Sequence, residues 1–503
     1  MKNLIEISKI VTKKKVRKIE IFDDNSLRHK NSKFNEFYES LMGGKFKNDR
    51  DASTALYGCS PTDDKYRQLK SRFRKRLLNT LFFLDINVPS TSNYDRAYYT
   101  VNKDWTLVKI LLSNNANFTA ATLARQILTI ALKFQFADII VNWCRILRKE
   151  ASLTNDEKAF EEYDQYIKQY SNILDAEIRS EELYQRVIIN YYKPYQKTTS
   201  LREKIDTYCD ALIGLSEIYE SPVVIYNMYL VWAYRHEMLY EFESLLDICN
   251  RAENYITENP LFHQEEKLTT FNLKKMSSFL HLRDYKRGKI NAEKCLISVL
   301  EGSEKWFEFL EYYILLCFHT QNFENAYAIH TKATTNNKFK SLSTSSKEKW
   351  YCYEAYLNVL SDIDEDGGEL KNNINKKNFK LNKFVLDPIL HHRELRILTV
   401  HLVIAQILYY LKKRSYGNVT EKIERLKGYS LRQLKKEDYF RTTQFIRLLQ
   451  QLLKSGYKSK NLSNTEKYYN RLLKHKFYYR GLLSEIEIIP YENVWDLILK
   501  IIN

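Results

Sequence analysis

With 503 residues, the chain is too long for one simple core and has the length of about three domains or of one elongated array. It contains only 12 glycines and 7 prolines, and this scarcity argues against all-β and Rossmann-type folds, whose turns and phosphate loops need many glycines. The net charge of +17 leaves two interpretations open, a polyanionic partner or lysine-rich helices that face solvent.

The basic excess is concentrated near the start of the chain. Residues 1–100 carry 21 basic and 12 acidic side chains, so about half of the net charge lies in the first fifth of the sequence. Within a basic N-terminal helical module, residues 1–86, helices are predicted at 34–44, 49–58 and 62–86, with glycine or proline at the turns. Helix-turn-helix DNA-binding domains have a comparable layout, and so do many three-helix caps.

Two segments of this module are candidates for contact with a polyanion. In the third helix, Tyr66, Leu69, Phe73 and Leu77 form one apolar stripe, and the basic side chains surround the rest of the circumference instead of forming one line. Both a solvated polar face and a phosphate contact are therefore open. The candidate polyanion-binding residues are Lys13, Lys14, Lys15, Arg67, Lys70, Arg72, Arg74, Lys75 and Arg76.

Residues 100–361 repeat a helical-hairpin pattern. Residues 283–295 align with residues 321–333 at an offset of 38. Each copy follows a strongly aromatic helix and has an aromatic residue near its start. Small or apolar residues follow three and ten positions after that aromatic, where two helices approach closely. The equivalent positions are Phe242, Leu245 and Ala252; Tyr285, Gly288 and Cys295; Phe323, Ala326 and Ala333; and Tyr416, Val419 and Leu426.

This pattern resembles the tetratricopeptide repeat, in which an aromatic residue closes the turn after the first helix and small residues follow in the second. The resemblance covers residues 200–360 and, more loosely, 104–150 and 390–475. It implies an all-α fold of stacked antiparallel helical hairpins that form a curved α-solenoid. The resemblance also implies a concave groove that holds peptides or partner helices.

The remaining segments complete the predicted organisation. One long helix is expected at 156–193, a polar loop at 362–387, further hairpins at 388–475 and a capping element with a final amphipathic helix at 476–503. Prolines preceded by a capping residue predict four helix starts. These pairs are Ser60-Pro61, Ser221-Pro222, Asn259-Pro260 and Asp387-Pro388.

The sequence offers no catalytic or cofactor motif. It contains no phosphate-binding glycine loop and no nucleophile elbow, and its seven cysteines are scattered singly, as expected for reduced cysteines in a cytosolic core. A partial calcium-loop match begins at Asp362, but Asn373 stands where a bidentate carboxylate is needed, which favours a solvated acidic loop. His391, His392 and His401 lack metalloprotease spacing. We therefore expect no enzyme, no cofactor, no metal, no membrane span and a cytoplasmic location.

Two functional hypotheses follow. The first is a scaffold or adaptor that binds a protein or peptide in its groove, with Tyr226, Trp232, Trp306 and Tyr313 as anchors. For any single one of these aromatics, however, core packing between hairpins is the interpretation that we favour. The alternative is a regulator associated with DNA or RNA, in which residues 1–86 contact the nucleic acid. The sequence leaves the partner and the oligomeric state open.

Overall fold

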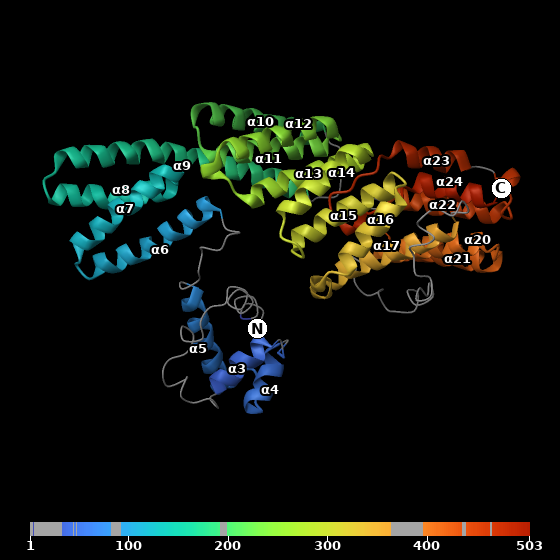
Figure 1. Ribbon diagram of the computed structural model, residues 1–503, viewed down its shortest axis with the longest axis horizontal. Coiled ribbons are helices and arrows are strands. Elements are labelled where there is room, and N and C mark those ends of the chain that lie inside the picture. Colours follow the sequence, from blue (N-terminus) through green and yellow to red (C-terminus); the bar gives the residue numbers. More distant parts are fainter. Residues whose placement is uncertain are drawn as a thin grey trace. The chain divides into compact units, whose positions relative to one another are not determined.

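The computed structural model describes Leu4 and residues 33–43, 45–46, 48–81, 92–191, 199–363, 396–434, 439–462 and 465–502. Within these ranges the chain forms 20 α-helices and no β-strand (Figure 1). This confirms the all-α fold class. The chain divides into two compact units, Met1–Leu174 with Leu261–Gln264 and Asp175–Pro260 with Glu265–Asn503, and the division falls within the long helix α9 (Glu157–Tyr191).

The first unit contains two groups of helices with separate hydrophobic cores. Besides the start of α9, its helices are α3 (Lys33–Met42), α4 (Asp49–Tyr57), α5 (Asp64–Thr80), α6 (Asn93–Ser113), α7 (Asn117–Phe134) and α8 (Ala137–Leu153). In the first group, α4 contacts both α3 and α5 around the buried rings of Phe37, Tyr66 and Phe73. In the second, α7 contacts α6 and α8 around Trp143 and Ile140.

Capping residues explain where the helices of this unit begin. The side chain of Asp63 accepts a hydrogen bond from the amide of Lys65 at 2.9 Å, so α5 begins at Asp64. The start predicted from Ser60-Pro61 is therefore wrong by three residues, because Pro61 lies in a turn. In the second unit, Ser221-Pro222 does begin a helix as predicted, whereas Pro260 opens a short 3-10 helix. The fourth predicted start, Asp387-Pro388, lies outside the described residues.

The second unit contains the hairpins predicted from the repeat pattern. Its helices after α9 are α10 (Thr199–Ile218), α11 (Pro222–Met238), α12 (Phe242–Glu258), α13 (Glu265–Leu282), α14 (Tyr285–Ser298), α15 (Glu304–His319), α16 (Phe323–Thr334), α17 (Thr344–Ile363), α20 (Arg396–Lys412), α21 (Tyr416–Gln433), α22 (Phe440–Lys454), α23 (Thr465–Lys474) and α24 (Tyr491–Ile502). Consecutive helices pack against each other throughout.

The hairpin turns share one backbone conformation. Tyr240, Arg283, Gln321 and Arg414 all have a positive φ between 53° and 60°, and each lies two residues before the second helix of its pair. After α13, the amide of Asp284 donates to the carbonyl oxygen of Phe279, five residues earlier, at 3.0 Å. This is the left-handed helix end that satisfies carbonyl groups left free by the last turn. The predicted aromatic position is therefore the first residue of each second helix.

The small or apolar residues of the repeat are buried where the helices meet. Leu245, Gly288, Ala326 and Val419 occupy equivalent positions and are all buried. Gly288 illustrates why the position stays small in α14. A Cβ atom there would overlap Cδ2 of Leu316 and lie 3.1 Å from Cβ of Phe279.

The first helices of successive pairs also contact each other. In the second unit α13 contacts α15 directly, and α17 contacts α20. We call the surface formed by α13, α15, α17 and α20 the first-helix face. In the parts of the chain that the structure describes, no helix is both long enough and apolar enough to span a membrane. All seven cysteines are free thiols, and each except Cys59 is buried.

The packing around Gly288 predicts opposite effects for two glycine substitutions. Gly288→Ala should lower the free energy of unfolding by about 1–3 kcal/mol, because the added methyl group overpacks the α14–α15 contact. Gly214→Ala in α10 is the control, since nothing lies within 4 Å of its Cβ position. It should raise stability by about 0.5–1 kcal/mol through helix propensity. Urea denaturation of both variants measures the difference, and equal effects would contradict the close approach.

Candidate partner-binding face

The most unusual element of the second unit is a non-helical segment near the end of the chain. Residues 475–490 connect α23 to α24 and contain only one short 3-10 helix, η9 (Leu483–Glu485). We call these residues the crossing segment, because Tyr479 contacts α13, Ile486 contacts α20 and Glu487 contacts α15. Tyr479, Ile486 and Ile488 of this segment are at most 1% exposed, so the segment is part of the core.

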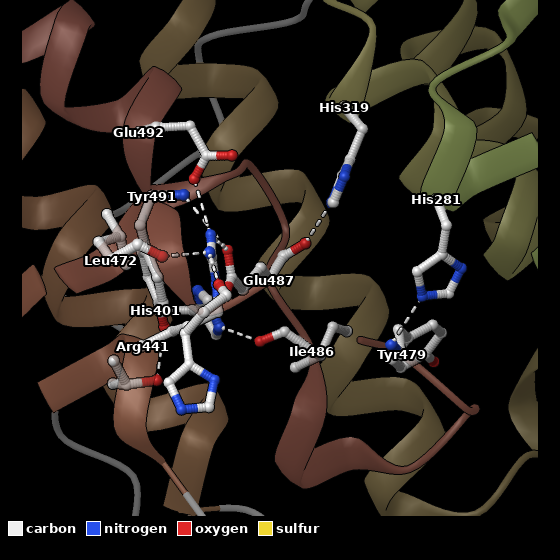
Figure 2. Close-up of polar contacts among 12 residues, drawn as sticks. His281, His319, His401, Arg441, Leu472, Tyr479, Ile486, Glu487, Tyr491 and Glu492 are labelled. Carbon is white, nitrogen blue, oxygen red and sulfur yellow. Dashed lines mark hydrogen bonds and ion pairs between the residues drawn. The ribbon is translucent and has the colours of Figure 1, made fainter. Parts of the chain in front are cut away.

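Three histidines of the first-helix face hydrogen bond to the backbone of the crossing segment (Figure 2). The amide of Tyr479 donates to Nε2 of His281 at 3.0 Å. Nε2 of His319 lies 2.7 Å from the carbonyl oxygen of Glu487, and Nε2 of His401 lies 2.9 Å from that of Ile486. Because carbonyl oxygens only accept, these two imidazoles donate.

Burial of the rings keeps all three imidazoles neutral, although the hydrogen bonds that they donate to backbone carbonyls oppose it. Burial penalises the charged ring and lowers the pKa of His281 to about 4, that of His319 to about 3 and that of His401 to about 4. Nε2 of His281 must be unprotonated to accept the Tyr479 amide, while its Nδ1 donates to the carbonyl of Ser277 at 2.6 Å. The neutral ring can thus act as acceptor on one side and donor on the other.

A buried arginine holds the end of the crossing segment. Arg441 of α22 contacts both carboxylate oxygens of Glu487, at 2.5 and 3.0 Å, and Glu492 at 2.7 Å. Its guanidinium also donates to the carbonyl of Leu472 at 2.9 Å (Figure 2). Burial alone would lower the pKa of Arg441, but the two carboxylates outweigh it and hold the pKa above its ordinary value. Removing one partner of an ion pair this buried strongly destabilises the fold, because the other charge is left buried and unpaired.

Tyr479 inserts its ring into the first-helix face. Its hydroxyl donates to Glu311 of α15 at 2.5 Å, and Lys349 of α17 pairs with the same carboxylate. The Tyr479 ring lies 5.6 Å from that of Tyr312. The next residue, Arg480, pairs with Glu485 within the crossing segment and donates to the carbonyl of Tyr191.

Beside Tyr479, the crossing segment leaves a cavity of about 510 Å³ open. The cavity lies among α15, the 3-10 helix η4 (Asn337–Ser341), the first turn of α17 and the crossing segment. Its lining mixes aromatic, charged and hydroxyl groups. The lining residues are Gly302, Glu304, Phe307, Glu308, Glu311, Tyr312, Lys338, Ser341, Leu342, Ser343, Ser346, Lys349, Trp350, Tyr479 and Gly481.

The aromatics predicted as partner anchors lie mostly inside the unit. Trp306 and Tyr313 of α15 are 1% and 5% exposed, so they present almost no side-chain surface. Tyr226 of α11 is half-buried, with its ring 5.7 Å from that of Phe271. Trp232 is half-buried as well, and the Arg235 guanidinium lies 5.6 Å from the centre of its ring. An anchoring role for these four aromatics stays a prediction.

The basic residues of α5 differ in their contacts within the fold. Lys70 pairs with Asp49 at 2.6 Å, and this aspartate also accepts from the hydroxyl of Tyr66 at 2.7 Å. The guanidinium groups of Arg72 and Arg76 lie 5.9 and 5.1 Å from the centre of the Phe34 ring.

The other three predicted cations of α5 face solvent. Arg74 and Lys75 are exposed, and Arg67 forms an exposed pair with Asp64 at 3.4 Å. Lys13, Lys14 and Lys15 lie outside the described residues. Contact of these residues with a polyanion stays a prediction.

The weaker metal candidates lie mainly in parts of the chain for which no structure is given. Asp362 is in the last turn of α17, while the rest of the partial calcium loop, His391 and His392 lie outside the described residues. His401 is fully buried against the crossing segment. Among the described ranges, no group of three or more His, Cys, Asp or Glu side chains is placed to hold a metal ion.

Sequence reasoning missed His281, His319, Arg441 and the crossing segment, and it considered His401 only as a metal ligand. The repeat contained one usable signal, because His281 and His319 are separated by the same offset of 38 that relates the aligned hairpins. Each stands four residues before the aromatic that begins the next helix. No comparable signal pointed to His401 or Arg441, since their partners are supplied by a segment distant in sequence.

Comparison with known proteins identified no relative of this chain. No protein-family model, no curated protein and no solved structure matches the chain. The helical-hairpin architecture and the contacts of the crossing segment are therefore the basis for any functional inference.

The neutral histidines predict that the crossing segment loosens in mild acid. Their pKa values are lowered from an ordinary value of about 6.5. Below pH 6.5, an imidazole that is detached and exposed therefore binds a proton, whereas the buried imidazole stays neutral. Attachment is therefore strongest above pH 6.5 and weakens as the pH falls towards 4. At pH 5, protection of residues 477–489 from hydrogen exchange should fall by up to roughly 30-fold per histidine, after correction for intrinsic rates.

The matched variant is His319→Gln/His401→Gln, which keeps a side-chain N–H donor at both positions but cannot titrate. Its exchange protection should respond much less to pH than that of the wild type. The carboxylates are the same in both proteins, so their effect on the pH dependence cancels when the wild type and the variant are compared. An identical pH response would show that the histidines do not control the attachment.

Proposed function

We propose that this protein is a non-enzymatic helical-repeat scaffold or adaptor, cytoplasmic in location, whose first-helix face binds an extended segment of a protein partner. The observation that carries the proposal is the crossing segment. It supplies an example, within the chain, of an extended polypeptide held on this face by side chains that bond to its backbone. Backbone contacts of this kind provide affinity, and neighbouring pockets provide specificity.

The repeat architecture supports the same conclusion. Shared left-handed turns, buried small residues and direct contacts between first helices are typical of tetratricopeptide-like arrays. We infer that the array is a curved solenoid and that the first-helix face is its concave side. The crossing segment covers part of this face, and the cavity beside Tyr479 remains open for a partner.

Site-specific photocrosslinking in the native host tests this proposal. A benzophenone amino acid at Glu308, which lines the open part of the first-helix face, should give one discrete crosslinked product. The control position is Ile297 of α14, which is 88% exposed but belongs to a second helix. Products from position 297 alone, or from neither position, would contradict binding at the first-helix face.

A second candidate function is nucleic-acid binding by the N-terminal helices. The observation that favours it is the exposure of Arg67, Arg74 and Lys75 on the side of α5 opposite the buried Leu69 and Phe73. Cations at i, i+7 and i+8 of a helix lie along one side, as a phosphate backbone requires. In this view the solenoid is the part that senses a partner.

Binding to a duplex at two salt concentrations tests the second candidate. If α5 contacts phosphates, Arg67→Gln/Arg74→Gln/Lys75→Gln should weaken binding and reduce the slope of log affinity against log salt by about 3. A charge-matched control neutralises the exposed Arg425, Arg432 and Lys458 of the second unit. Equal losses in both variants would indicate a general charge effect, and no loss in either would exclude the contact.

A further inference from the structure

The cavity beside Tyr479 has the dimensions of a ligand site. Its volume of about 510 Å³ falls within the range of about 300–1,000 Å³ that is common for pockets that bind small molecules or side chains. Phe307, Tyr312, Trp350 and Tyr479 contribute aromatic surface to its wall. These side chains are held by the core, because each is at most 7% exposed. The aromatic wall is therefore rigid before any ligand arrives.

One polar group in this wall is accessible from the cavity and forms no hydrogen bond with a described residue. Tyr312 is 7% exposed and lines the cavity, with its hydroxyl 3.5 Å from the position that a Cβ of Gly481 would occupy. No described residue forms a hydrogen bond with this hydroxyl. The carboxylate of Glu311, in contrast, is already bonded to Tyr479 and Lys349. A ligand that hydrogen bonds to Tyr312 would therefore meet a hydroxyl that no described residue already uses, and a net hydrogen bond of this kind contributes about 0.5–1.5 kcal/mol.

The charged groups at the cavity carry both signs. Glu304 and Lys338 line it, are exposed and form no ion pair with any described residue. The first turn of α17 adds the hydroxyls of Ser343 and Ser346. A ligand with an aromatic ring and both donors and acceptors nearby matches this combination, and a residue within a polypeptide supplies all three.

The crossing segment shows how such a residue can be bound next to the cavity. Tyr479 places its ring 5.6 Å from that of Tyr312 and directs its hydroxyl to Glu311. We propose that the cavity binds an aromatic side chain of the partner polypeptide, with tyrosine preferred because its hydroxyl can hydrogen bond with Tyr312. This inference rests on the proposed function and names the residue class that the first-helix face selects.

Ligand-detected NMR on the full chain tests the cavity with small probes. N-acetyl-L-tyrosinamide at millimolar concentration should show saturation transfer to its ring protons, and N-acetyl-L-leucinamide should show at least fivefold less. Tyr312→Phe removes only the hydroxyl and should weaken binding of the tyrosine probe by about 2- to 10-fold. The same substitution should leave binding of N-acetyl-L-phenylalaninamide unchanged.

A plugged cavity and its control complete the experiment. Ser346→Trp should fill the cavity and reduce the tyrosinamide signal at least fivefold, while Ser345→Trp should not. The two serines are adjacent in α17 and both contact Oγ of Ser343, at 2.9 and 3.0 Å, but only Ser346 lines the cavity. Circular dichroism verifies that both variants fold.

The outcomes separate this inference from the proposed function. Equal signals from the leucine and tyrosine probes, or an unchanged signal in Ser346→Trp, would overturn the aromatic site even if crosslinking at Glu308 succeeds. A specific tyrosinamide signal without any crosslinked product would support the aromatic site and count against a protein partner.

Discussion

The buried backbone of the crossing segment is the constraint on which the second unit depends. Peptide groups removed from water need hydrogen-bond partners, and residues 475–490 have no helix or sheet of their own to provide most of them. The first-helix face supplies partners through His281, His319 and His401. Neutral imidazole suits this task because it can accept from an amide or donate to a carbonyl without bringing a charge into the core.

The crossing segment also changes how the repeats depend on one another. In a simple solenoid each repeat contacts only its neighbours, so stability is a sum of local terms. Here one segment bonds to α13, α15 and α20, and Arg441 of α22 contacts both Glu487 and Glu492. Hairpins that are distant in sequence are thereby joined through one element. We expect the second unit to unfold more cooperatively than a simple repeat array of the same length.

The same arrangement limits where a partner can bind. The crossing segment is too firmly anchored in the core to be exchanged for another peptide at low cost, since Tyr479, Ile486 and Ile488 would all return to water. Binding of a partner beside the crossing segment, where the cavity lies, therefore costs less free energy than displacing the segment from the first-helix face. The exposed cations of α5 belong to the first unit and form a separate candidate surface.

The sequence by itself determined the local structure of this protein. Helix formation and hairpin turns depend on interactions within a few turns of helix. The sequence therefore predicted them from the scarcity of glycine and proline, from the spacing of Tyr285, Gly288 and Cys295, and from the unbroken pattern of α9. Tertiary structure alone decided the contacts of the candidate binding surface. Glu487, in a short alternating segment, pairs with Arg441, and His401 bonds to Ile486, 85 residues away. Periodicity carries no information about such contacts, because they depend on which surfaces stacking brings together.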